Sequence, residues 1–396
     1  MRKNYYPKVE HIELSDKNTK RRLIAAVVFG IIAVVAIVIS ISRLLTTEPG
    51  WQNVTSQSKE AYASEFVLQY EFGKNATAEN RQLTNYYTEL TETAYKLFSS
   101  DKSFENVANL RFLSLNPNKE IELDPALYSA LIQMEDRREL FYAPIYSEYS
   151  SLYFSQTDSE AIAFDPEFDA EEKKFIDELL TFVKNPEMIS LEFLGNNEVN
   201  LRISDEYLSF ANENEIKEFI SFGWMKNAFV IDYIADNLTA RGFTKGILTS
   251  FEGFVRNLSD TTFVYPVNDR VGNIVYNAAN AEIPAKNSLV CFRDFMLNSQ
   301  DTQNYYEYSD GTTRTPYIGA DGRCHNSVSS LILYSDSKSC SELLLEGLVV
   351  YIADEFNENL IKSDSIYCEN FVIHASGDAE IGQIYSKDKV YTLRKN

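Results

Sequence analysis

The sequence predicts an α/β protein of the α+β kind, in which helices mix with antiparallel strands, preceded by one transmembrane helix. Three observations lead to this prediction. They are an uncharged apolar stretch near the N-terminus, several segments with helical periodicity, and alternating segments joined by glycine and asparagine turns. The 396 residues are 44% hydrophobic, which is enough to bury a large core.

The apolar stretch LIAAVVFGIIAVVAIVISIS, residues 23–42, carries no charge. At 1.5 Å per residue, about twenty helical residues span a hydrocarbon core of roughly 30 Å. Lys20, Arg21 and Arg22 precede the stretch and only Arg43 directly follows it, so the positive-inside rule predicts a cytoplasmic N-terminus. A cleaved signal peptide, the alternative, has a shorter apolar region and a small-residue cleavage site. We therefore expect an uncleaved, single-pass anchor in the cell membrane.

The two sides of this anchor differ in charge. Residues 1–22 hold seven Lys/Arg and three Asp/Glu, whereas residues 44–396 hold 29 Lys/Arg and 55 Asp/Glu, a net charge of -26. A surface that acidic repels the phosphates of nucleic acid, so we expect no nucleic-acid binding. The predicted parts are a cytoplasmic basic tail (1–22), the transmembrane helix (23–43), a polar linker (44–60) and an extracytoplasmic domain (61–396).

Within the extracytoplasmic domain, periodicity predicts the first elements. FVLQYEF, residues 66–72, alternates as a strand does, and apolar residues recur at the helical period over 77–98. A further helix is expected to begin at Asp124, whose carboxylate can cap it, with Pro125 at the first helical position.

A third helix and a hairpin are expected next. Residues 170–185 show a helical pattern whose predicted buried residues are Phe175, Leu179, Phe182 and Val183. Alternating segments at 189–195 and 198–204 flank Gly195, Asn196 and Asn197, which indicates a hairpin.

Four cysteines, Cys291, Cys324, Cys340 and Cys368, fall in the domain expected outside the cell. One or two disulfides are possible in an oxidising compartment, and free buried thiols are an equal alternative. None of the four belongs to a CxxC pair, which argues against a zinc site.

The stretch GWMKNAFVIDYIADNLTARGF, residues 223–243, predicts a helix ended by Gly242, followed by a strand over 246–251 and the pair Glu252-Gly253. The apolar face of this helix consists of Ala228, Ile231, Ala235 and Leu238.

This order of features resembles the FAD:protein FMN transferases, the ApbE or thiamine-biosynthesis lipoprotein family. That family has a Lys-Gly-Tyr-x-x-Asp stretch opening a helix, then a glycine, a strand and a Gly-Gly pair. Segments from about residue 60 to 390, such as ISLEFLGNNEVNLRI and NSVSSLILYSDSKSCSELLLEGLVVYI, follow the same order. The resemblance implies an ApbE-like flavin transferase fold, with FAD and Mg²⁺ as cofactors if the activity survives.

The motif residues themselves depart from the family. Aligned on Asp232, the family's Lys-Gly-Tyr falls on Asn227, Ala228 and Phe229, and Lys226 stands one position early. The family's Mg²⁺-holding Asp and Thr fall on Ser341 and Leu345. No catalytic residue and no metal ligand is therefore predicted. The positions that match the family's cofactor cleft are Lys226, Asn227, Glu252, Gly253 and Asp294.

Three functional hypotheses follow. The favoured one is a catalytically inactive, membrane-anchored binding or scaffold module whose partner is an envelope or exported protein. The second is an active transferase that moves FMN from FAD to a threonine of a membrane or exported protein, and the third is an unrelated ectodomain. The second hypothesis requires substituted ligands, for which the candidates are Asp294, Asp321, Asp336 and Glu342.

A predicted cleft between the helix at 224–241 and the strand at 246–251 separates these hypotheses. If Arg138, Phe292 and Leu345 fill it, the active transferase loses its pocket. Aromatic residues in the same region either stack a flavin or belong to the core. These residues are Trp224, Phe229 and Phe251.

Overall fold

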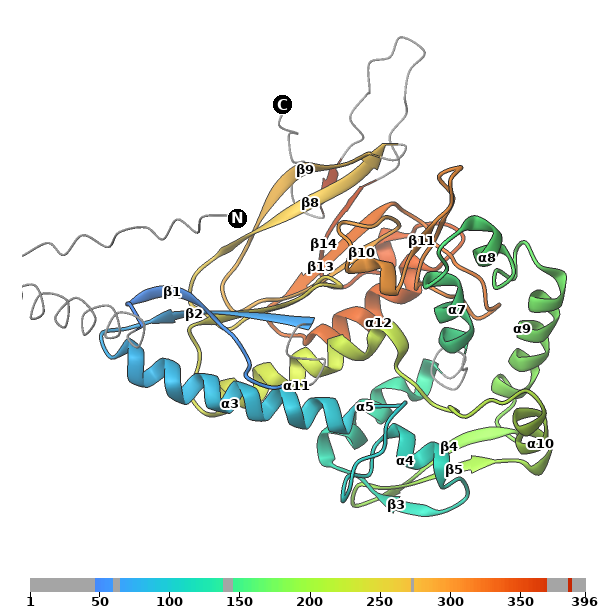
Figure 1. Cartoon of the computed structure of the whole chain (residues 1–396). Helices are drawn as coiled ribbons and strands as arrows, with labels where there is room; N and C mark the ends of the chain where they lie inside the picture. The colour runs from blue at the N-terminus through green and yellow to red at the C-terminus, as the bar shows by residue number, and fades with distance from the viewer. Residues whose placement is uncertain (1–46, 60–64, 138–144, 272–273, 369–383, 387–396) are drawn as a thin grey trace, which may run out of the picture.

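The computed structural model describes residues 47–59, 65–137, 145–271, 274–368 and 384–386 (Figure 1). The predicted basic tail and transmembrane helix lie outside these residues. Within the described part of the chain, no helix is long and apolar enough to cross a membrane. The described residues form mixed helices and antiparallel strands, which confirms the predicted fold class.

The main sheet has eight strands in the order β1-β2-β6-β7-β10-β13-β14-β15. Every neighbouring pair is antiparallel. The strands are β1 (Gly50–Val54), β2 (Phe66–Phe72), β6 (Gly246–Ser250), β7 (Phe254–Asn257), β10 (Ser288–Arg293), β13 (Ser330–Ser335), β14 (Asp364–Cys368) and β15 (Ile384–Ser386).

Helices cover one face of this sheet, and a long two-stranded ribbon covers part of the other (Figure 1). Because side chains alternate along a strand, Val290 of β10 joins the core under the helices whereas Leu289 packs toward the ribbon. The helices are α3 (Ala76–Leu97), α11 (Lys226–Ala240) and α12 (Cys340–Tyr351), and the ribbon consists of β8 (Phe263–Val271) and β9 (Ile274–Ile283).

A second group of elements lies beside the main sheet and contains the three-stranded sheet β3-β5-β4 (Figure 1). The helices of this group are α4 (Leu110–Leu115), α5 (Pro125–Met134), α7 (Ile145–Tyr153), α8 (Asp158–Ile162), α9 (Ala170–Val183) and α10 (Asp205–Glu213). Its strands are β3 (Glu120–Glu122), β4 (Ile189–Gly195) and β5 (Glu198–Ile203), and the short pair β11 (Tyr306–Glu307) and β12 (Thr313–Arg314) lies close to α8.

Several predicted elements are confirmed with their local chemistry. The strand at 66–72 is β2, and the helix predicted over 77–98 is α3. The Asp124 carboxylate accepts a hydrogen bond of 2.8 Å from the backbone N–H of Ala126, with Pro125 at the first helical position. In the hairpin turn, Asn196 and Asn197 adopt φ of 53° and 64°, which asparagine tolerates better than most residues.

Two predictions need correction. Part of the predicted linker at 44–60 belongs to the main sheet, because residues 50–54 form edge strand β1. The middle residues of β1 are all exposed, so the sequence lacks the alternation of apolar and polar residues that predicts a strand. On α9, Leu179 and Val183 are buried as predicted, and so are Ile176 and Leu180, whereas Phe175 and Phe182 are half-buried. Phe182 faces the aromatic side chains of α10 and not the centre of the core. Its ring stacks on that of Tyr207 with 4.9 Å between ring centroids.

All four cysteines are free thiols, which decides between the two alternatives left open by the sequence. Three are buried, and Cys324 is partly buried. Burial raises the pKa of the Cys324 thiol to about 12, so this side chain stays protonated and unreactive at neutral pH.

Candidate functional site

The predicted helix at the centre of the resemblance is α11, and the short turn Gly223–Met225 precedes it. Its predicted apolar residues, Ala228, Ile231, Ala235 and Leu238, are all buried. Gly242 has φ of 85° and ends the helix as expected. This geometry places Lys226 and Asn227 at the N-terminal end of α11.

Four of the five predicted cofactor positions come together at this end. The amide Nδ2 of Asn227 donates to Glu65 Oε2 at 3.0 Å and to Glu252 Oε1 at 2.8 Å. The Lys226 ammonium lies 4.0 Å from Glu65 Oε2. Gly253 follows Glu252 in the same turn and adopts φ of 105°. We call Glu65, Lys226, Asn227 and Glu252 the Asn227 cluster.

Gly253 has a specific steric reason to be glycine. A Cβ added there would lie 3.0 Å from the carbonyl oxygen of Cys291, and the positive φ disfavours other residues. The glycine therefore lets the turn approach β10 closely. Sequence reasoning missed Glu65, because it sits just before strand β2, and no pattern links it to α11.

The Asn227 cluster contains two carboxyl groups, those of Glu65 and Glu252, and the ammonium of Lys226. Burial, together with the neighbouring Glu65 carboxylate, raises the pKa of Glu252. Within the described residues, Glu252 Oε2 and Asn227 Oδ1 have no hydrogen-bond partner. Two carboxylates and a single ammonium thus surround the Asn227 amide.

The fifth predicted position, Asp294, has different partners. Its Oδ2 lies 3.5 Å from Arg270 Nη2 and accepts a hydrogen bond of 3.2 Å from Asn326 Nδ2. Asp269 is a second buried carboxylate near it, and it accepts a hydrogen bond of 2.9 Å from the Ser329 hydroxyl. Burial raises the pKa of both Asp269 and Asp294 to about 6.

The raised pKa of Asp294 makes the free energy of unfolding depend on pH. Because the folded-state pKa of Asp294 is about 6 and the ordinary value is 3.8, the folded state binds the proton more tightly. The resulting stabilisation is complete below about pH 4 and is lost as pH rises through 6. At 1.36 kcal/mol per pKa unit, the loss is about 2–3 kcal/mol.

Asp294→Asn is therefore expected to remove this part of the pH dependence. We would measure urea unfolding from pH 4 to pH 7 for the parent chain and the variant, with Asp336→Asn at an exposed position as control. The free-energy difference between parent and Asp294→Asn should shift by about 2–3 kcal/mol over this range. A constant difference at all pH values would contradict the raised pKa.

Side chains occupy part of the cleft that the sequence predicts beside α11, and pockets remain at both ends of the helix. Trp224 is 8% exposed, and its ring centroid lies 4.9 Å from that of Tyr317 and 6.4 Å from that of Phe254. Phe292 is fully buried, and Leu345 packs against the same core. Trp224 and Phe229 are therefore core residues, and Phe251 is half-buried. The remaining residue named for this region, Arg138, lies outside the described residues.

The retained Asp232 has a structural role. Its carboxylate accepts hydrogen bonds from the backbone N–H groups of Cys340 at 2.9 Å and Ser341 at 2.8 Å, at the N-terminus of α12. Arg256 Nη1 lies 2.5 Å from the same carboxylate. Asp232 thus links α11, α12 and β7.

The residues at the family's metal positions do not fit Mg²⁺, which prefers carboxylate oxygens in an octahedral shell. The Ser341 hydroxyl lies 3.0 Å from that of Ser339, and Leu345 offers only hydrocarbon. Two of the substituted ligands have protein partners, since Asp321 pairs with His325 at 2.9 Å and Glu342 forms a capping box with Ser339. Among the residues that the structure describes, no three His, Cys, Asp or Glu side chains are grouped to hold a metal.

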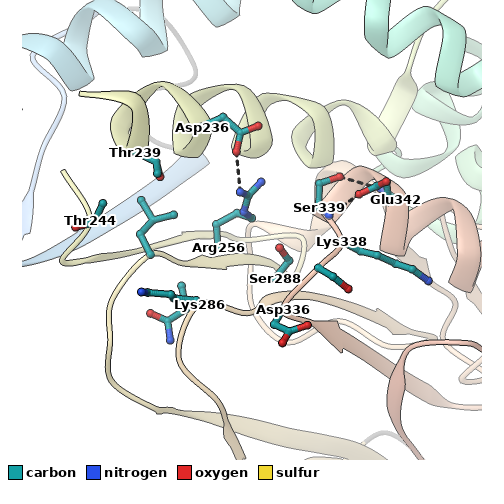
Figure 2. Close-up of a pocket in the computed structure, with 13 residues that line it drawn as sticks. Asp236, Thr239, Thr244, Arg256, Lys286, Ser288, Asp336, Lys338, Ser339 and Glu342 are labelled. Carbon is teal, nitrogen blue, oxygen red and sulfur yellow. Dashed lines mark hydrogen bonds and ion pairs between the residues drawn. The ribbon is translucent and has the colours of Figure 1, made fainter. Parts of the chain in front are cut away.

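Two pockets flank α11. One, of about 510 Å³, lies beside Glu65, Trp224 and Lys226. The other, of about 530 Å³, lies between the C-terminal half of α11 and the N-terminus of α12 (Figure 2). The basic side chains of this second pocket are paired with acidic ones, as Arg256 is with Asp236 at 2.7 Å. Asp336 and Glu342 also line it.

Comparison with known proteins agrees with this geometry at the level of fold. No protein-family model matches the chain, and no curated protein matches its sequence. The ApbE protein of Thermotoga maritima superposes with a TM-score of 0.52 at 12% identity, covering 86% of this chain and 97% of that one. A histidine-to-glycine mutant of the flavin transferase ApbE from Vibrio cholerae gives 0.53 at 13% identity, covering 86% and 98%. The chain thus has the ApbE fold.

Proposed function

We propose that the chain is a membrane-anchored, extracytoplasmic protein in which the ApbE fold no longer transfers flavin. It acts as a binding or scaffold module for an envelope or exported protein. The anchor and the location rest on the uncharged stretch at 23–42 and on the basic residues before it.

The Asn227 cluster carries the proposal that flavin transfer is lost. A flavin diphosphate is an anion and needs cationic or N–H partners. At the N-terminal end of α11, the carboxylates of Glu65 and Glu252 instead converge on the Asn227 amide. Carboxylates repel an anionic diphosphate, and the Lys226 ammonium lies 4.0 Å from the Glu65 carboxylate.

The absence of flavin binding is the first test. The full-length chain, held in nanodiscs of uncharged phosphatidylcholine, is titrated with FAD and with FMN, with and without Mg²⁺, while flavin fluorescence and the melting temperature are followed. We expect no binding at millimolar flavin and no transfer of FMN to a threonine-containing peptide. Tight, Mg²⁺-dependent binding would overturn the proposal, and an active ApbE flavin transferase serves as the positive control.

The alternative, a transferase with substituted ligands, is tested by restoring the family residues. Ser341→Asp with Leu345→Thr supplies the two missing metal positions, and Glu252→Gly in the same chain removes one repelling carboxylate. If a weakened site survives, these changes should strengthen Mg²⁺-dependent FAD binding. We expect no gain from the first two changes alone, because Glu65 and Glu252 still repel the diphosphate.

A further inference from the structure

A short surface segment carries several large apolar side chains in contact with solvent. It runs from residue 154 to residue 172 and includes α8 between α7 and α9. Four of its side chains are exposed: Phe154 by 62%, Ile162 by 42%, Phe164 by 40% and Phe168 by 50%. Grouped exposed apolar residues mark interaction sites more often than scattered ones do. We call residues 154–172 the α8 surface.

The α8 surface is also the site of concentrated negative charge. Its sequence, FSQTDSEAIAFDPEFDAEE, contains seven Asp/Glu and no Lys or Arg. Glu160, Glu167 and Glu171 are exposed. Arg314 approaches from β12, but it pairs with Asp165 at 2.6 Å and with Glu167 at 3.0 Å. The α8 surface therefore combines exposed apolar side chains with carboxylates.

Two carboxylates, the partly exposed Asp158 and the buried Asp165, fix the conformation of this surface. Asp158 accepts hydrogen bonds of 3.0 Å from the Tyr306 hydroxyl and from the backbone N–H of Ser309. Asp165 is buried and accepts a hydrogen bond of 2.8 Å from the Tyr308 hydroxyl. The segment is thus tied to the β11 and β12 pair, which lowers the ordering cost of binding a partner. Figure 1 shows α8 near the edge of the molecule, next to α7.

We propose that the α8 surface binds a basic amphipathic helix of a partner protein, with Lys and Arg on one side and apolar residues on the other. Such a segment matches both the charge and the apolar area. A second copy of this chain is disfavoured because its net charge is -21. Anionic membranes and nucleic acids are repelled for the same reason. The inference rests on the proposed binding function and names the surface and the chemistry of its partner.

The probe is a labelled peptide of about 18 residues in which Leu and Lys occupy opposite faces of a helix. A peptide of the same composition with scrambled order is its control. The full-length chain is held in phosphatidylcholine nanodiscs, and binding to empty nanodiscs is subtracted. We expect about tenfold tighter binding of the amphipathic peptide, weakened by added salt. Equal binding of the two peptides, or none, would overturn the inference.

Two variants locate the binding to this surface. Ile162→Ser with Phe164→Ser removes apolar area, and Glu160→Lys with Glu171→Lys reverses charge. Each is expected to weaken binding about tenfold. The melting temperature of each variant is measured as well, because Glu160 accepts a hydrogen bond of 2.8 Å from the Gln156 backbone N–H and Ile162 and Phe164 are only 42% and 40% exposed.

Matched controls are Leu115→Ser with Leu194→Ser and Glu187→Lys with Glu213→Lys, which make the same changes at exposed positions elsewhere. An equal loss in these controls would place the binding outside the α8 surface. The chain could also associate with itself through this surface. If it does, and if Ile162→Ser with Phe164→Ser abolishes that self-association, the surface binds a second copy and the inference is overturned.

Flavin titration of the same preparation separates the two proposals. Failure of the peptide to bind, with flavin binding also absent, would remove this inference and leave the proposed loss of flavin transfer intact. Mg²⁺-dependent flavin binding would overturn the proposed function whatever the peptide does.

Discussion

Replacing Arg293 with methionine is expected to lower the free energy of unfolding by about 3–5 kcal/mol. Arg293 is 1% exposed, and its Nη2 lies 2.5 Å from Asp301 Oδ1. Its Nη1 also donates to the Glu252 carbonyl oxygen at 3.2 Å, so it connects β10 to the turn beside the Asn227 cluster. The variant leaves the Asp301 carboxylate buried without its cation, which is more costly than losing the pair as a whole.

Urea unfolding followed by circular dichroism measures this effect. Arg293→Met with Asp301→Leu removes both charges and is expected to recover most of the lost stability, because no unpaired charge then stays buried. A single variant as stable as the parent would show that the buried ion pair does not hold this region together. The exposed pair Lys286 and Asp260 is a control, where Lys286→Met should cost less than about 1 kcal/mol.

Replacing Asp232 with alanine is expected to lower the free energy of unfolding by about 3 kcal/mol. The change removes two hydrogen bonds to the N-terminus of α12 and leaves Arg256 with only its partner Asp236. Hydrogen bonds that involve a charged group contribute more than neutral ones, and a helix N-terminus favours a carboxylate. The expected result is a less stable core and a loosened contact between α11 and α12.

Thermal and urea unfolding of Asp232→Ala test this role, and hydrogen exchange of the α12 amides shows where the stability is lost. The control is Asp236→Ala, one turn further along α11. Its side chain is 66% exposed although it also pairs with Arg256, so the loss should stay below about 1 kcal/mol. Equal losses for the two variants would contradict the capping role of Asp232.

The role of Asp232 also bears on the resemblance to the flavin transferases. This aspartate is the residue on which the motif was aligned, and it joins two helices to the sheet. The contacts of Asp232 hold the fold together and require no cofactor. The residues at the expected cofactor positions differ from those of the family, because Asn227 and Glu252 lie where the family has Lys and Gly.

The sequence alone determined the elements with strong local signals. Strand β2, helix α3, the Asp124 cap and the hairpin turn at Asn196 were predicted because periodicity, capping and positive φ are properties of a few neighbouring residues. The order of these elements also carried the resemblance, and the ApbE fold follows from it. Four positions of the predicted site came together because they lie on α11 and on the turn after the next strand.

Only the tertiary structure decided which side chains meet across the chain. Glu65 joins Asn227 and Glu252 because β2 and β6 are neighbours in the sheet, a pairing over 180 residues that no local pattern encodes. The α9 face was predicted only in part, because Leu179 and Val183 are buried as expected whereas Phe182 contacts aromatic rings of α10 and is half-buried. Trp224 occupies part of the expected cleft because it packs against Phe254 and Tyr317, which are distant in the sequence. Periodicity tells which face of an element is apolar, whereas packing against distant elements decides what that face contacts and whether a pocket remains.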